Sequence, residues 1–207
     1  MNNSQNSSTE IKTVACPNCK NANEVKIVNV IQADSPERNE LFSGMLNCKE
    51  CEHCATVFQV DVEQLIYKDV ENNFLIVENR EVEEDELREL QENIDSLASE
   101  LAYLENIERP EVRLVFYRED FIEKIVLLER AIDDRLIEFA KFQLFQNVGD
   151  AEFSADKRRL LYDFSNTDED KLQFVIFDRS SGQAVSGLHL PYNDFEEVKG
   201  IVMNSID

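Results

Sequence analysis

Five cysteines are the residues of this sequence that could do chemistry. Cys16 and Cys19 lie in "ACPNCK", and Cys48, Cys51 and Cys54 lie three apart in "NCKECEHCA". Two residues between paired cysteines let one tight turn direct both sulfurs at a single ion, and two such turns supply the four thiolates of a zinc ribbon. Because a structural zinc ion takes four ligands, one of the five cysteines is left over.

Three interpretations of the cysteines are open. Paired Cys-x-x-Cys motifs in a reducing compartment favour a metal site over structural disulfides. The run "CKECEHC" also has the spacing of an iron–sulfur motif, which needs a fourth cysteine nearby, and Cys16 before Pro17 could complete it. A redox-active dithiol pair is the third interpretation. We expect one structural Zn²⁺ per chain, with an iron–sulfur cluster as the weaker alternative.

The N-terminal segment points to a cytoplasmic protein with reduced cysteines. "MNNSQNSSTE" has neither the basic start nor the apolar stretch of a signal peptide, and we expect residues 1–11 to be a disordered polar tail. No stretch approaches about 18 consecutive apolar residues, so we expect no membrane span.

The elements that must position the cysteines are short strands separated by turns, over residues 12–80. "EVKIVNVIQ" (24–32) is rich in Val and Ile, which is typical of a strand. Ser35 is a candidate cap for a short helix at 36–43, with Pro36 in its first turn and Gly44 at its end. Three more strands are predicted in "ATVFQVDV", "QLIYKD" and "NNFLIVEN". These elements predict a zinc-ribbon-like small β domain.

Residues 81–108 predict a long acidic helix with one narrow apolar seam. The segment has eleven Asp and Glu residues against one Arg. The seam has the 3,4 spacing of a coiled coil and consists of Leu87, Leu90, Ile94, Leu97, Leu101 and Leu104. It could form a homodimer through 87–104, or pack on a second predicted helix at 118–146 that is apolar over a broad face. We favour packing within the chain, because three heptads are a minimal coiled-coil signal.

The rest of the chain completes an α+β fold. Residues 81–149 form an acidic helical hairpin in this interpretation, which ends at Gly149. Residues 150–207 then form a C-terminal α/β element. It consists of a three-stranded meander, with "DRSSGQ" as a hairpin turn, and a closing helix in "YNDFEEVKGIVMNSI".

These motifs together resemble the CpXC domain, a bacterial and archaeal family named for two Cys-Pro-x-Cys motifs. The matching residues are "CPNC", "VNVIQADSPERNELFSGMLN", "CEHC" and "LIYKDVENNFLIVEN", and the resemblance extends to "EKIVLLERAIDDRLIEFAK". In the family a stretch like residues 44–47 precedes the second pair by three residues. The resemblance therefore implies that the metal ligands are Cys16, Cys19, Cys51 and Cys54, and that Cys48 is the spare cysteine.

Two departures from the family pattern affect the turns and not the ligands. Glu52 stands where the second motif has proline. Lys20 and Ala55 stand where ribbon turns commonly have glycine. We expect His53, inside the second motif, to be an exposed turn residue rather than a ligand.

The charge of the chain argues against nucleic-acid binding. The formal net charge is −22, whereas proteins that bind DNA or RNA draw most of their affinity from Lys and Arg. Residues 11–80 alone hold seven Lys and Arg against eleven Asp and Glu, so they contain no local basic patch. We expect a protein partner that is still unidentified.

Catalytic signatures are sparse in this chain. There are two histidines and no nucleophile elbow, phosphate-binding Gly loop or zinc-protease helix. The sequence therefore favours a non-enzymatic protein with structural zinc that acts through protein–protein contacts. Two alternatives are an acidic mimic of nucleic acid that inhibits a basic partner, and a metal-dependent enzyme that uses carboxylates near Asp133, Asp134 and Glu138.

Overall fold

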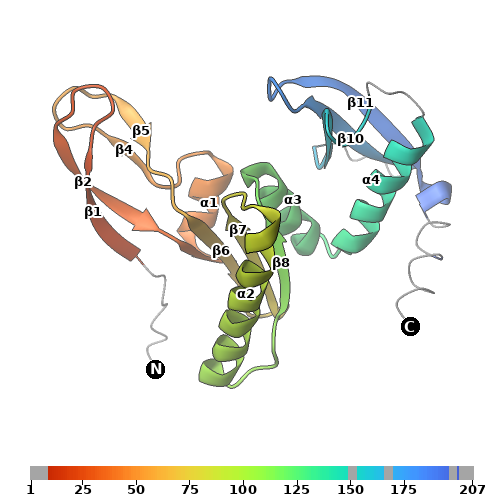
Figure 1. Ribbon diagram of the computed structural model, residues 1–207, viewed down its shortest axis with the longest axis horizontal. Coiled ribbons are helices and arrows are strands. Elements are labelled where there is room, and N and C mark those ends of the chain that lie inside the picture. Colours follow the sequence, from red (N-terminus) through yellow and green to blue (C-terminus); the bar gives the residue numbers. More distant parts are fainter. Residues whose placement is uncertain (1–8, 149–152, 166–169, 196–199, 201–207) are drawn as a thin grey trace. The chain divides into compact units, whose positions relative to one another are not determined.

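The structure is a computed structural model that describes residues 9–148, 153–165, 170–195 and 200 (Figure 1). It has the expected α+β class, with several small sheets and the helices α1 to α4. The chain divides after Phe121 into two compact units, Met1–Phe121 and Ile122–Asp207.

Two antiparallel hairpins lie at the start of the first unit. β1 (Thr9–Ala15) pairs with β2 (Ala22–Val28), and β4 (Cys48–Glu50) pairs with β5 (Val57–Gln59). β1 begins within the segment predicted to be a disordered tail, so that prediction was wrong for residues 9–11, while residues 1–8 lie outside the described part. The strand forms because Thr9, Ile11 and Thr13 are β-branched residues at alternate positions, which suits a pleated ladder.

A four-stranded sheet forms the body of the first unit. Its order is β3 (Val30–Gln32), β6 (Gln64–Asp69), β7 (Phe74–Asn79) and β8 (Glu111–Val115). The pairs β3–β6 and β7–β8 are parallel, and β6–β7 is an antiparallel hairpin. α1 (Pro36–Phe42) follows β3; Ser35 precedes it as expected, but its side chain makes no capping hydrogen bond.

The acidic helix is α2 (Glu84–Glu105), which connects β7 to β8 (Figure 1). Parallel neighbours need such a crossover connection, usually a helix. Leu90, Ile94, Leu97 and Leu101 of the seam lie against the sheet. The cluster that they form there also contains Ile66, Leu75, Val77, Ala98, Val112 and Leu114. The seam thus packs within the chain, but its partner is the β7–β8 side of the sheet and not the segment 118–146. Leu104, the last seam residue, is 70% exposed.

The segment 118–146, predicted as one helix, forms two. α3 (Arg118–Glu129) ends before Ala131, which has a positive φ of 54°. α4 (Asp134–Val148) then begins, and the Arg135 N–H donates to Oδ1 of Asp133 at 3.0 Å. An aspartate that accepts a bond from the N–H two residues later is a helix N-cap, so Asp133 starts a new helix inside an apolar run.

The second unit contains the expected meander. β9 (Arg158–Tyr162), β10 (Lys171–Asp178) and β11 (Ala184–Pro191) are antiparallel, with β10 in the centre. Its core consists of Leu127, Leu136, Ile137, Ala140, Leu160, Leu172, Phe174, Ile176 and Phe195. The alternating burial of β10 follows from its period-2 pattern, which turns Leu172, Phe174 and Ile176 to this core. Residues 192–195 are helical, and most of the predicted closing helix beyond them lies outside the described residues.

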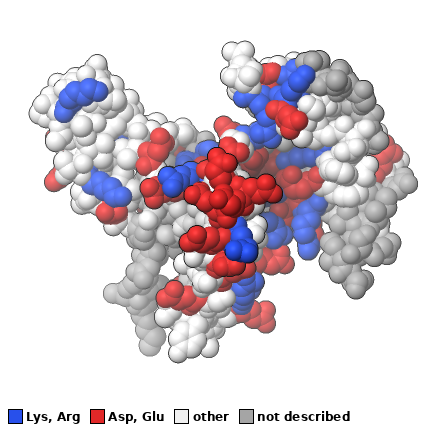
Figure 2. Space-filling view, viewed as in Figure 1, with Lys and Arg blue, Asp and Glu red and all other residues white. Residues whose placement is uncertain are grey.

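The charge on the surface is strongly acidic near α2. Glu84, Asp85 and Glu86 form its first turn, and Figure 2 shows acidic side chains gathered over this end of the helix. No helix among the described residues is long and apolar enough to cross a membrane.

Candidate metal centre

Two turns of the same construction hold four of the cysteines. The first cysteine turn (16–19) joins β1 to β2, and the second (51–54) joins β4 to β5. In the first turn the Lys20 N–H donates to the carbonyl oxygen of Cys16 at 2.9 Å, and in the second the Ala55 N–H donates to that of Cys51, also at 2.9 Å. The shared pattern directs both sulfurs of each pair to the same side.

Each turn ends in a left-handed residue. Lys20 has φ 63° and Ala55 has φ 57°, which is the region that glycine adopts most easily. The sequence places Lys and Ala at these two positions, so both turns contain a conformation that disfavours a Cβ atom by about 1–2 kcal/mol.

The two turns bring four sulfurs together. The Sγ atoms of Cys16, Cys19, Cys51 and Cys54 all lie within 4.8 Å of one another. The Cys16–Cys54 sulfur distance is 3.7 Å, and the Cys19–Cys51 distance is 3.6 Å. A tetrahedral ion with zinc–sulfur bonds of about 2.3 Å requires sulfurs about 3.8 Å apart. The donor set and its spacing therefore fit a Zn²⁺ ion, and the four residues are those that the sequence singled out.

Amide and hydroxyl groups surround the sulfurs. The side-chain amide of Asn23 donates to Sγ of Cys51 at 3.5 Å, and that of Asn21 donates to Sγ of Cys19 at 3.5 Å. The Asn18 amide lies 3.7 Å from Sγ of Cys54. Such donors stabilise thiolates and orient metal ligands. Sequence reasoning missed these three residues, although three asparagines within "NCKNAN" were an available signal.

The surroundings of the cysteines lower the pKa of two of them and raise that of a third. The hydroxyl and backbone N–H of Thr56 lower the pKa of Cys54 to about 6. Burial alone would raise the pKa of Cys51, but the N–H groups of His53 and Cys54 and the Asn23 amide bring it below its usual value.

The pKa of Cys19 moves in the opposite direction. The Asn21 N–H acts to lower it, but burial and the neighbouring sulfurs of Cys54, Cys51 and Cys16 raise it to about 11. Four adjacent thiolates repel one another, so full ionisation of the group needs a cation among them. A divalent ion supplies that charge.

Two buried asparagines join the hairpins that carry the turns. The Asn47 side chain accepts from the Val28 N–H at 2.8 Å and donates to the Val28 carbonyl at 2.9 Å. At the other end, Oδ1 of Asn23 accepts from the Glu52 N–H at 3.1 Å. The two asparagine side chains thus connect β2 to the residues on either side of β4, and so fix the distance between the two cysteine turns.

Cys48 lies outside the four-sulfur group. Its thiol donates to the Gly44 carbonyl oxygen at 3.5 Å from within β4. An iron–sulfur cluster built on the run 48–54 would need this sulfur beside those of Cys51 and Cys54, and the structure instead groups Cys51 and Cys54 with Cys16 and Cys19. His53 is exposed, as expected of a turn residue.

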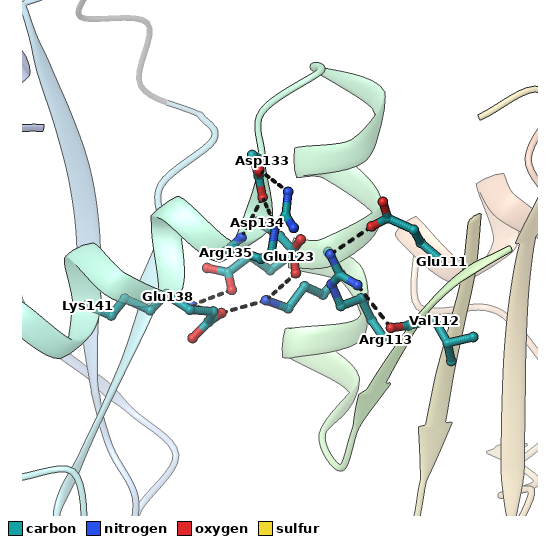
Figure 3. Close-up of polar contacts among 10 residues, drawn as sticks. Glu111, Val112, Arg113, Glu123, Asp133, Asp134, Arg135, Glu138 and Lys141 are labelled. Atoms are coloured by element: carbon teal, nitrogen blue, oxygen red, sulfur yellow. Dashed lines mark hydrogen bonds and ion pairs between the residues drawn. The ribbon is translucent and has the colours of Figure 1, made fainter. Parts of the chain in front are cut away.

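The acidic residues near the start of α4 contact basic side chains (Figure 3). Asp133 pairs with Arg135 at 2.7 Å. Lys124 lies 3.0 Å from Asp134 and 2.7 Å from Glu138. Because an ammonium group lies between these two carboxylates, the arrangement favours a structural ion network over a divalent-cation site.

The same network reaches a second buried pair. Lys141 on α4 donates to Glu138 at 3.1 Å and to Glu123 on α3 at 2.5 Å. Burial raises the pKa of the Glu123 carboxyl despite this partner, and its other oxygen accepts from the Tyr162 N–H at 2.5 Å. Burial would also raise the pKa of Glu138, but the ammonium groups of Lys141 and Lys124 lower it.

Comparison with known protein families gives a match over more than half of the chain. The family model described as "CpXC protein" matches residues 14–141, a span that holds all five cysteines and the pair of helices up to Lys141. No curated protein and no solved structure matches the chain.

Proposed function

Because the chain belongs to the CpXC protein family, we propose that it is a binding protein whose cysteine turns hold one structural Zn²⁺ ion. The family match covers more than half of the 207 residues. In this proposal the protein acts by contact with a protein partner and not by catalysis.

The observation that carries the proposal is the spacing of the four sulfurs. Two of the six separations are 3.6 and 3.7 Å and all six are within 4.8 Å, a spacing that suits coordination of one ion by thiolates alone. Four thiolate ligands leave no open position for water or substrate, so such an ion supports structure rather than catalysis. When bound, the ion would supply the positive charge that lets all four thiols ionise.

The ion would tie together elements that bury little apolar surface. The buried core around the cysteine turns consists of Cys16, Val25, Ile27, Cys51 and Phe58. Small β modules of this kind commonly depend on a metal or on disulfides for their stability. We therefore assign to the zinc ion the task of holding β1–β2 against β4–β5.

The test is the metal content of the full chain purified without oxygen from cells grown in unsupplemented medium. We expect one zinc per chain and no visible absorbance. Cys51→Ser should lose the metal, and Cys48→Ser, the matched control, should keep it. Equal metal loss in both variants would show that the ligand set is wrong. Detection of iron with sulfide, and a brown colour, would show that the cysteines hold an iron–sulfur cluster and not zinc.

The acidic face of α2 favours a second candidate function. The first turn exposes Glu84, Asp85 and Glu86, and net charge of this magnitude attracts basic partners. The protein would then be an acidic mimic of nucleic acid that occupies the binding face of a basic protein. The test is co-purification with such a partner at low salt. Release of the partner by salt supports the idea, because exposed charges are screened. A partner that stays bound at high salt contradicts it.

A further inference from the structure

The C-terminal end of α2 projects beyond the sheet on which the helix packs (Figure 1). A helix of 22 residues is about 33 Å long, whereas a six-residue strand such as β7 spans only about 20 Å. Leu101 is the last seam residue in the cluster against the sheet. The residues that follow Leu101 therefore lie past the apolar surface that covers the rest of the seam.

This projecting end exposes large apolar side chains. Tyr103 is 86% exposed and Leu104 is 70% exposed. Asn106, which has a left-handed φ of 53°, ends the helix and turns the chain back. The Ile107 N–H then donates to the Ala102 carbonyl oxygen at 3.1 Å, which places the half-buried Ile107 beside the last turn of α2.

The turn between β6 and β7 lies at the same end of the first unit. Lys68, near the end of β6, forms an ion pair with Glu105 of α2. The Asn73 side-chain amide donates to the Arg109 carbonyl oxygen at 3.3 Å. Val70, within this turn, is 49% exposed. Segments far apart in sequence thus bring apolar side chains to one end of the unit, and we name the set of Val70, Tyr103, Leu104 and Ile107 the α2-end patch.

The rim of the α2-end patch is acidic. Glu71, Glu100 and Glu108 are all exposed. Two cations at this end of the unit contact carboxylates of their own chain, since Lys68 pairs with Glu105 and Arg109 pairs with Asp95. The patch therefore combines exposed apolar side chains with an excess of negative charge.

We propose that the α2-end patch docks a basic amphipathic segment of a partner protein. The apolar side chains of the segment would cover Tyr103 and Leu104, and its Lys or Arg side chains would lie beside the glutamates of the rim. This inference rests on the proposed function as a binding protein, for which it names the contact surface and the class of partner. An exposed aromatic side chain within a polar rim is typical of the energetic centre of an interface. A guanidinium group can also stack on the Tyr103 ring.

The charge of the patch decides among the possible occupants. A second copy of the chain brings its own net charge of −22 and is repelled by the acidic rim. Nucleic acids and anionic membrane surfaces are repelled for the same reason, because both present phosphate groups. A cationic segment is attracted by the same charge, so the favoured occupant is a basic protein segment.

The α2-end patch is distinct from the acidic first turn of the helix. Glu84, Asp85 and Glu86 lie at the opposite end of α2 and offer charge alone. Salt screens contacts between exposed charges, whereas the burial of apolar surface does not depend on that screening. A partner docked on the patch should therefore keep part of its affinity at high salt, which a partner held only by the first turn should not.

The test is selection from a random peptide library on the full chain, at a physiological ionic strength of about 0.15 M. We expect the enriched peptides to combine Lys or Arg with apolar residues at helical spacing. The enriched peptides are then titrated against variants of the full chain. Tyr103→Ala and Leu104→Ala should each raise the dissociation constant about tenfold or more, as expected of residues at the centre of an interface.

Ile11→Ala is the matched control for Leu104→Ala. Ile11 is also 70% exposed and lies on β1 of the same unit, so its truncation should leave the dissociation constant unchanged. Glu100→Gln, at the rim of the patch, should weaken binding more than Glu84→Gln, in the first turn of α2. The metal content should be the same in every variant, so loss of peptide binding leaves the zinc site of the proposed function untouched.

Several results would overturn the proposal. Enriched peptides without basic residues, or without apolar residues, would contradict the chemistry assigned to the partner, and so would a selection that enriches nothing. Equal dissociation constants for Leu104→Ala and Ile11→Ala would place the contact elsewhere. Equal effects of Glu100→Gln and Glu84→Gln would show that binding follows the net charge of α2 and not the patch.

Hydrogen exchange of the unmodified chain locates the contact without a substitution. A saturating amount of an enriched peptide should slow amide exchange in residues 102–107 and in the turn at 70–73. The amides in the first turn of α2 should exchange as before. Slower exchange confined to that first turn would overturn the proposal and would support the acidic mimic instead.

Discussion

The region around the cysteine turns and the helix-and-meander region of the second unit are stabilised in different ways. The first buries five residues in its core, two of them cysteines. The second buries nine, contributed by α3, α4, the strands and the residues after β11. In the proposed function the first region depends on coordination to an ion, whereas the second is held by apolar burial and by an ion network that joins two helices.

Magnitudes support this division. A fully buried aliphatic or aromatic side chain contributes about 1.5–3 kcal/mol to folding stability. Val25, Ile27 and Phe58 together therefore contribute less than a structural zinc ion, whose binding is worth about 10–16 kcal/mol. The second unit does not require a metal ion for its stability in this proposal, because the β10 side chains Leu172, Phe174 and Ile176 already lie in a larger apolar cluster. Each prediction below changes one region and uses the other as its reference.

Removal of the metal should have the largest effect. A chelator should abolish hydrogen-exchange protection in β1, β2, β4 and β5, because the ion contributes about 10–16 kcal/mol to such a site. The amides of β10 should keep their protection. Exchange measured by mass spectrometry distinguishes the two regions in one sample. Equal loss in β10 would show that the ion stabilises the whole chain, and unchanged exchange in β1 would show that it stabilises neither region.

Glu123→Ala should be the next largest change, and it should act on the second unit. It leaves the buried Lys141 ammonium without its closest carboxylate and the Tyr162 N–H without its acceptor. Breaking a buried pair costs about 3–5 kcal/mol, and we expect the lower end because Glu138 still contacts Lys141.

Urea unfolding with β10 exchange as the readout measures this effect. Glu129→Ala, at an exposed position of the same helix, is the control and should change the free energy of unfolding by less than about 0.5 kcal/mol. The metal content should be the same in both variants. A Glu123→Ala protein as stable as the control would mean that the ion network does not hold α3 to α4.

Ala55→Gly should stabilise the cysteine-turn region by about 1 kcal/mol, since it relieves a left-handed alanine. The same substitution at Ala15 is the control, because that residue lies in the extended strand β1, where glycine weakens the chain by about 0.5–1 kcal/mol. The melting temperature of the metal-bound protein should therefore move in opposite directions in the two variants. If both substitutions shift the melting temperature in the same direction, the left-handed conformation of Ala55 does not reduce the stability of the second cysteine turn.

The smallest effect should be a pH dependence in the β10–β11 hairpin. The Ser180 hydroxyl and the N–H of Ser181 hold the pKa of Asp178 well below its ordinary value of 3.8. Because the folded-state pKa is the lower one, this stabilisation is fully present above about pH 4 and is lost as the pH falls through the folded-state pKa.

Asp178→Asn should flatten that dependence. Exchange of the hairpin amides between about pH 5 and about pH 3 compares the two proteins, after correction for intrinsic exchange rates. The effect should be modest, because the Asp178 side chain is still 22% exposed to water, which screens its interactions. Identical pH profiles for the two proteins would exclude Asp178 as the group responsible.

The cysteine turns could be predicted from the sequence because their information is local. Two residues between cysteines determine where the sulfurs point, and the resemblance to the family, through the stretch 44–47, indicated which pair was the second. The asparagine donors were missed because a polar side chain beside a turn looks the same whether it faces solvent or a sulfur. The phase of β10 was also predictable, since its alternation of apolar residues is directly visible in "KLQFVIFD".

The rest of the fold depends on information that a local pattern lacks. The parallel pairs β3–β6 and β7–β8 join segments far apart in sequence, so strand order was not available from composition. The apolar seam of α2 predicted burial correctly but did not specify a sheet as its partner. In "RAIDDR" the cap signal of Asp133 was present, yet the unbroken apolar periodicity around it outweighed that signal in the prediction of one helix.

The distance in sequence between the two cysteine turns has a consequence for the unfolded chain. An ion bound to Cys19 and Cys51 cross-links positions 32 residues apart and so closes a loop that contains β3 and α1. The entropy of closing a loop rises only slowly with its length, by about 0.6 kcal/mol for each doubling. An ion captured before folding would therefore hold β3 in a small volume near the chain that forms its partner β6. Metal supply would then affect how fast the four-stranded sheet assembles, as well as how stable the cysteine turns are.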